Sequence, residues 1–191
     1  MCLLIFSCNG RKANSVATHA GTKASNNFVS SQSKYLSTKH NVLFLRHKKF
    51  DGFLYRLYNN TKDTIFVESY SNRILDGISK KWYPNSKIME IRYYSKGQKN
   101  GKQLAYFQNK KKRFEFTAEN DQYEGELREW NVAGKLIHLA TYENGQEEGT
   151  QKMWYDNGKI RANYVMKEGK RYGLLGTKNC INVSDSIFVI K

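Results

Sequence analysis

The sequence predicts an all-β fold in which tandem β-hairpin repeats of 24 residues form one elongated, single-sheet antiparallel meander. The first observation is that glycines recur at a fixed period, because a constant period is stronger evidence for the architecture than any local sequence pattern. The second is composition: 13 Tyr, 10 Phe and 3 Trp accompany a single Pro, and aromatic residues favour strands that few prolines interrupt. The third is a pair of turn signals in each period, with room for two short strands between them. We expect non-repeat strands at both ends of the array.

Residues 1–8 form a short apolar run that ends in Cys8. The run resembles the end of a bacterial lipoprotein signal peptide, with Ile5 as the branched residue three positions before the cysteine and Ser7 as the small residue before it. This partial lipobox predicts lipidation of Cys8 and membrane attachment in the cell envelope, on the periplasmic or outer-membrane side. The alternative is a hydrophobic start without targeting meaning, in a cytoplasmic protein.

Residues 9–40 are rich in Ser, Thr, Asn and Lys and show no sustained apolar period, so they are interpreted as a flexible basic linker. The first 50 residues carry eight Lys or Arg and no acidic residue, which is about half of the net charge of +15. We favour a solvated tether over a contact with anionic lipid or nucleic acid. A first strand is predicted at residues 42–45, where four apolar residues follow each other.

The repeat array is expected over residues 41–180, anchored by glycines whose successive spacings are 25, 24, 24, 24 and 24. A glycine at the entrance of a strand indicates a positive φ or a close backbone approach that a Cβ would block. Both roles are structural. The repeat glycines are Gly52, Gly77, Gly101, Gly125, Gly149 and Gly173.

Five residues after the glycine, each repeat carries a large side chain, and this column includes all three tryptophans of the chain. We predict an aromatic ladder on one face of the sheet, where bulky side chains of neighbouring hairpins pack side to side. Its members are Leu57, Trp82, Tyr106, Trp130 and Trp154.

Each repeat contains two turn signals. The first lies eight to ten residues after the glycine, as in Asn157-Gly158-Lys159, and Asn-Gly predicts a two-residue hairpin turn because both residues tolerate a positive φ. A second lies near positions 19 to 21 of the repeat and reads Lys96-Gly97-Gln98, Asn144-Gly145-Gln146 and Glu168-Gly169-Lys170.

The segments Gly149 to Ile160 and Tyr142 to Gly149 resemble the two halves of the MORN-variant repeat. This family includes the bacterial YwqK-type antitoxin-like proteins, and the resemblance covers about residues 52–175. It implies a fold of MORN-type β-hairpins and a binding or scaffold role. The antitoxin members imply a specific toxin as partner.

After Gly173 the repeat pattern ends, and residues 181–191 are predicted to form a capping strand that covers the open edge of the sheet. The apolar runs at 42–45 and 64–67 are expected to do the same at the other end. Cys2, Cys8 and Cys180 match no C-x-x-C pattern, so no disulfide framework is expected. Cys180 is interpreted as a small buried residue or as a reactive thiol.

The sequence contains no established catalytic, phosphate-binding or calcium-binding motif, and its four histidines are scattered along the chain. We therefore assign no catalytic residue, metal or cofactor and expect a protein that is not an enzyme. The basic run at 110–113 lies among aromatic residues, which is one pattern of single-strand nucleic-acid binding. Nucleic acid is considered unlikely because those aromatics belong to the repeat and the lysines occupy a hairpin turn.

Charge reverses sign along the array. Residues 73–113 contain 12 basic and 2 acidic residues, whereas residues 118–149 contain 2 basic and 8 acidic residues. Such a dipole favours steering of a protein partner or head-to-tail self-association. The predicted function is a non-catalytic protein-binding or scaffold module, lipid-anchored in a bacterial envelope. The alternative is an antitoxin or immunity protein that neutralises a partner toxin.

Overall fold

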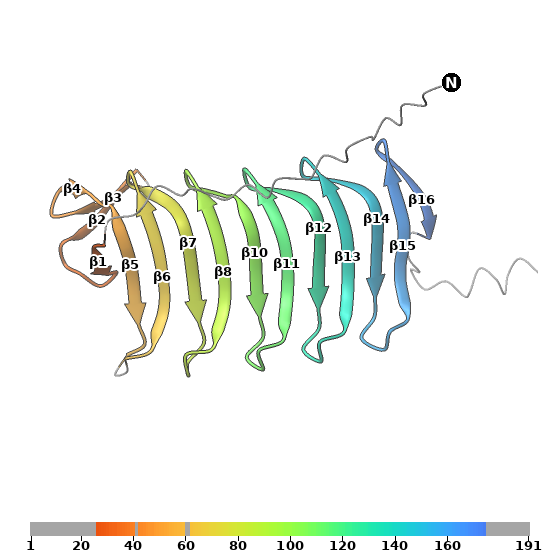
Figure 1. Cartoon of the computed structure of the whole chain (residues 1–191), viewed down its shortest axis with the longest axis horizontal. Coiled ribbons are helices and arrows are strands. Elements are labelled where there is room, and N and C mark those ends of the chain that lie inside the picture. The colour runs from red at the N-terminus through yellow and green to blue at the C-terminus, as the bar shows by residue number, and fades with distance from the viewer. Residues whose placement is uncertain (1–25, 41, 60–61, 175–191) are drawn as a thin grey trace, which may run out of the picture.

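The computed structural model describes residues 26–40, 42–59 and 62–174, which form strands and turns and no helix (Figure 1). One long sheet contains most of these strands in a single row. Its strands are β1 (Phe28–Ser30), β5 (Gly52–Leu57), β6 (Thr64–Ser71), β7 (Ile74–Trp82), β8 (Ile88–Ser95), β9 (Gln98–Lys99), β10 (Gly101–Tyr106), β11 (Lys112–Glu119), β12 (Gln122–Trp130), β13 (Leu136–Glu143), β14 (Gln146–Trp154), β15 (Ile160–Lys167) and β16 (Lys170–Leu174).

From β5 to β16 the strands of this sheet neighbour each other in chain order, every pair is antiparallel, and β9 is a short extra strand that pairs only with β8. The predicted all-β meander is therefore confirmed. The exception is β1, which runs parallel to β5 and makes the sheet a mixed one.

Strand β1 corrects the predicted linker, because residues 28–30 lie within the segment 9–40. The Phe28 ring stacks on the Phe53 ring at 4.7 Å between centroids. The Phe53 amide donates to the Asn27 carbonyl at 2.8 Å, so this short apolar run satisfies the open backbone edge of β5. β1 thus covers the edge that we expected residues 42–45 or 64–67 to cover. Residues 9–25 lie outside the described residues.

A separate three-stranded sheet precedes the array and contains β2 (Leu36–Lys39), β3 (Val42–Leu45) and β4 (Lys48–Lys49). The strand predicted at 42–45 is therefore present, although in this small sheet. Phe50, which follows β4 directly, is only 1% exposed, and its ring lies 6.0 Å from that of Tyr70 in the long sheet. The small sheet is thereby joined to the first repeat by an aromatic contact.

Two-residue turns join successive repeats along the upper edge of the sheet in Figure 1. In Asn144–Gly145 both residues have positive φ, 50° and 79°, and Glu143 pairs directly with Gln146. This is the geometry of a type I′ hairpin turn. All three of the predicted second turns adopt this type I′ geometry. Two further turns adopt it without glycine, at Asn72–Arg73 and Asn120–Asp121.

The hairpin loops along the lower edge are longer than predicted. In the turn Asn157-Gly158-Lys159, the Gly158 amide donates to the Tyr155 carbonyl at 2.8 Å and the Tyr155 amide donates to the Lys159 carbonyl at 2.9 Å. Gly158 has a φ of 85°, whereas Asn157 is not left-handed. The loop is therefore a β-turn followed by one left-handed residue. A register shift follows at once, since Trp154 pairs with Ile160 and its neighbour Met153 with Ala162.

The six repeat glycines all have positive φ, between 70° and 141°. Gly52 and Gly101 begin their strands, as expected, and the other four lie inside strands and not at turns. At Gly149 the register moves from the pair Ala140–Gln151 to the pair Tyr142–Glu147, so three residues of β14 oppose the single residue Thr141. Such a bulge bends and twists the strand, and the positive φ makes glycine the suitable residue there.

The bent strands give the sheet an inner face and an outer face. In β12 Leu127 is only 5% exposed, while Glu126 and Arg128 on either side are exposed. Among the described residues no second layer covers the long sheet, and its strands are visibly bowed in Figure 1, so we attribute the shielding of this inner side to curvature. The residues two positions after the repeat glycines are all buried there: Leu54, Ser79, Gln103, Leu127 and Gln151.

We predict that Gly149→Ala lowers the free energy of unfolding by about 1–2 kcal/mol, because an L residue at this φ is strained. The added methyl has room, since its nearest neighbour would be Thr141 Cβ at 3.6 Å, so the loss reports backbone strain alone. Urea denaturation measures it. Glu148→Ala is the matched control, and equal stability of both variants would contradict the bulge geometry.

Candidate binding surface

The predicted ladder residues lie on the outer face, each at the lower end of its strand and half-buried. Among the described residues, no ring contact joins two of them, so the ladder does not form as predicted. The reason is strand spacing: an intervening strand separates successive members by about 9.6 Å, beyond the range of ring contact. Each instead pairs with a residue on the next strand, as Trp130 does with Leu136.

Hydrogen bonds, and not stacked rings, connect successive repeats at this lower edge. The Tyr58 hydroxyl donates to the Trp82 carbonyl at 2.9 Å, and the Tyr83 hydroxyl donates to the Tyr106 carbonyl at 3.0 Å. In the next repeat the Asn109 amide group replaces tyrosine and donates to the Val132 carbonyl at 2.8 Å. Two tyrosines that lie six residues after their glycines, and Asn109, which lies eight residues after Gly101, therefore connect the first repeats.

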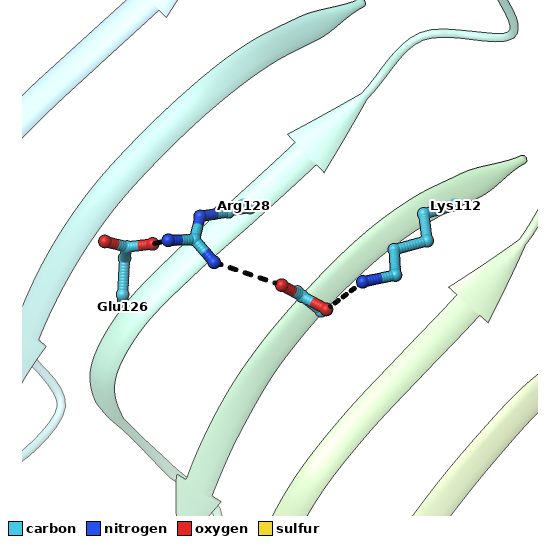
Figure 2. Close-up of polar contacts among 4 residues, drawn as sticks. Lys112, Glu126 and Arg128 are labelled. Carbon is cyan, nitrogen blue, oxygen red and sulfur yellow. Dashed lines mark hydrogen bonds and ion pairs between the residues drawn. The ribbon is translucent and has the colours of Figure 1, made fainter. Parts of the chain in front are cut away.

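A charged network crosses β11 and β12 on the outer face (Figure 2). Glu115 is nearly buried and accepts a hydrogen bond from Lys112 Nζ at 2.7 Å and one from Arg128 Nη1 at 3.2 Å. Arg128 also forms an ion pair with Glu126. The network holds two cationic side chains, both about half exposed, in fixed positions between adjacent repeats.

The electrostatics of Glu115 follow from these partners. The hydrogen bond from Lys112, supported by Arg128, holds the pKa of the Glu115 carboxyl below its usual value of 4.5, although burial acts in the opposite direction. Glu115 is therefore ionised at neutral pH, which keeps Lys112 and Arg128 oriented.

Lys112 also lies over the Trp130 ring, 5.6 Å from its centroid. Beside this pair the surface is hollowed by a recess of about 400 Å³, which is lined by Lys111, Lys112, Trp130, Ala133 and Gly134. A smaller recess of about 210 Å³ adjoins Trp154 in the following repeat. Tryptophan beside cationic side chains is a combination that is enriched at the energetic centres of protein interfaces.

The outer-face strand residues around these recesses change in chemistry from repeat to repeat, while the backbone repeats. The positions one and three residues after the glycine hold apolar, basic, acidic and hydroxyl side chains in turn. Repeat proteins commonly bind partners through such variable positions on a constant scaffold. These residues are Ile78 and Lys80, Lys102 and Leu104, Glu126 and Arg128, Thr150 and Lys152.

The inner face carries an aromatic row that the sequence analysis missed. Arg92 lies over the Phe114 ring at 4.6 Å, and ring contacts continue from Phe116 to Tyr123 at 4.8 Å and from Tyr123 to Tyr142 at 4.9 Å. Burial raises the pKa of the Tyr142 hydroxyl. The rings of Phe116, Tyr123 and Tyr142 thus pack on one another in edge-on and tilted contacts along the inner face, although Tyr123 stays 39% exposed.

The inner face also holds His138, whose Nδ1 lies 3.1 Å from Glu129 Oε2. This hydrogen bond lowers the pKa of the Glu129 carboxyl. Across residues 26–40, 42–59 and 62–174, no three or more His, Cys, Asp and Glu residues are grouped so as to hold a metal ion. Nor does the described chain contain a helix with the length and hydropathy to cross a membrane. Cys8, Cys180 and the predicted capping strand at 181–191 lie outside the described residues.

Comparison with known proteins identifies the repeat. The family model of the MORN repeat variant matches residues 75–96 and 147–166. No curated protein matches the chain. Two crystal structures of TarM, one a Staphylococcus aureus mutant in complex with fondaparinux, α-GlcNAc-glycerol and UDP, are 18% and 17% identical to it, with TM-scores of 0.33 and 0.32. Each match covers 58% of this chain and only 21% of TarM.

We predict that Glu115→Gln reduces the dependence of stability on acid pH. Because the pKa of Glu115 is lowered by folding, its contribution is present above the usual value of 4.5 and is lost as pH falls through the lower folded value. Urea unfolding at pH values from about 6 to about 3 should show a smaller loss for the variant than for the wild type. Glu119→Gln, an exposed carboxylate, is the control; equal slopes for Glu115→Gln and wild type would refute the network.

Proposed function

We propose that this MORN-variant repeat protein is a non-catalytic binding module that docks a protein partner on the outer face of its sheet. MORN repeats are generally associated with protein or membrane binding. The observation that carries the proposal is the pair of Trp-lined recesses at Trp130 and Trp154, set among outer-face residues that vary from repeat to repeat.

Two further features support a protein as the partner. The Glu115 network holds Lys112 and Arg128 in place before binding, so less side-chain entropy is lost when a partner contacts them. The exposed outer-face residues also carry both signs of charge, with Lys102 in one repeat and Glu126 in the next. Such a pattern selects a partner by complementary charge and orients it along the array.

The proposal includes attachment to the bacterial envelope through a lipid on Cys8. The support is the sequence pattern of Ile5, Ser7 and Cys8, followed by a polar segment before the array. An antitoxin or immunity role would be a special case of partner binding, in which the docked protein is a toxin, and it is supported only by the resemblance of the repeat motifs.

We expect affinity capture with the whole chain to recover a protein whose binding depends on the outer face. Lys102→Glu and Glu126→Lys, both at exposed outer-face positions of β10 and β12, should each weaken its binding by about tenfold or more. Glu168→Lys at the upper edge is the matched control and should leave the affinity unchanged. Recovery of nucleic acid in place of protein, or equal affinity for all variants, would reject the proposed surface.

Lipid attachment is tested separately. In a bacterial host that carries the native gene with its upstream sequence, the protein should incorporate labelled palmitate and fractionate with membranes. Cys8→Ser should abolish the label, because the thiol of that cysteine is the acceptor. Cys2→Ser controls for the other cysteine of the apolar run. A label that persists in Cys8→Ser, or its absence from the wild type, would exclude this anchor.

A further inference from the structure

In two adjacent repeats the lower-edge hairpin loops are basic and the upper-edge turns are acidic, and we propose that copies of this chain associate edge to edge through these loops and turns. The lower-edge hairpin loops of one copy would contact the upper-edge acidic turns of the next. This inference does not depend on the outer-face partner, since it uses the edges of the sheet and not its face.

The hairpin loops of the lower edge share a lysine column. The tenth residue after each of the first five repeat glycines is a lysine, so each of these hairpin loops carries one at the same sequence position. The loop around residues 107–113 is the strongest, with four basic side chains and no acidic one. Lys110 and Lys135 are exposed, and neither side chain forms a hydrogen bond or ion pair with another described residue. The lysine column consists of Lys62, Lys87, Lys111, Lys135 and Lys159.

Two adjacent turns on the upper edge are acidic. Residues 119–124 and 143–148 each contain three acidic side chains and no basic one. Glu119 and Glu143 occupy the same position in successive repeats, directly before a type I′ turn, and both are exposed. Glu119 and Glu143 therefore recur at the end of their strands at the same interval as the lysines of the other edge.

The basic loops and the acidic turns recur at equal intervals along their edges. Both edges are built by the same strands, so loops below and turns above recur every second strand, about 9.6 Å apart. Two copies placed in the same orientation would align one hairpin loop with each turn without any change of backbone. The loops that carry Lys110 and Lys135 belong to adjacent repeats, as do the turns that carry Glu119 and Glu143. Two charge pairs could form together.

The contact joins different surfaces of the two copies, so it is heterologous. The basic and acidic edges lie on opposite sides of one molecule, and a third copy could add in the same way. Association would therefore be open-ended and would grow with protein concentration. It would also weaken as salt screens the exposed charges.

The experiment is sedimentation velocity of the full chain over a range of concentrations, at low and at moderate ionic strength. Wild type should form dimers and larger species at low salt that dissociate at moderate salt. Lys110→Glu with Lys135→Glu, or Glu119→Lys with Glu143→Lys, should each weaken association by about tenfold or more through like-charge contacts. Combining all four substitutions should restore it, because the two edges are complementary again.

Rescue by the fourfold variant separates this contact from misfolding and from general charge effects. Glu168→Lys, on the upper edge outside the acidic turns, is the matched control and should associate like the wild type. A wild type that stays monomeric at low salt, or a fourfold variant that does not recover, would overturn the proposal. Loss of outer-face partner binding with intact self-association would reject only the proposed function.

Discussion

A sheet of one layer can bury its apolar side chains only by bending over them, and this constraint governs the rest of the structure. Each repeat bends its strands at two places: at the glycine with positive φ and just after the hairpin loop, where the register shifts by one residue. The bends enclose an inner side where Leu127, Ala140 and Gln151 are almost fully buried. The repeat glycines thus make this core possible, because their positive φ permits the strand curvature that encloses it.

The same curvature makes the two faces differ in the side chains that they bury and expose. On the inner face, Arg92 and aromatic rings pack against one another from Phe116 to Tyr142, although Tyr123 stays 39% exposed. The outer face keeps its tryptophan column, its Glu115 network and its variable charged residues accessible. Charged residues also lie in the turns at both edges of the sheet, beyond the ends of the strands. In the proposed function, a partner would meet a surface whose chemistry changes every 24 residues while its backbone does not.

Periodicity in the sequence predicted the all-β class, the order of the strands and the second turn of each repeat, because these depend on local residues such as Asn144 and Gly145. The aromatic ladder was predicted wrongly because a period along the chain says nothing about the strand that lies between two equivalent residues. Strand β1 was missed because three residues in a polar segment give no periodic signal. The inner row at Phe116 and Tyr142 depends on which residues face each other across strands, and register became known only from the structure.

The central claim is that curvature alone seals one face of an open sheet, and thiol labelling measures it directly. In a background in which Cys2, Cys8 and Cys180 are replaced by serine, single cysteines are placed at Glu126, Leu127 and Arg128, three consecutive positions of β12. The account predicts slow labelling of Leu127→Cys and fast labelling of Glu126→Cys and Arg128→Cys under native conditions, with equal rates after unfolding. Equally fast labelling of all three in the native protein would contradict it, because it would mean a flat sheet that is open on both sides.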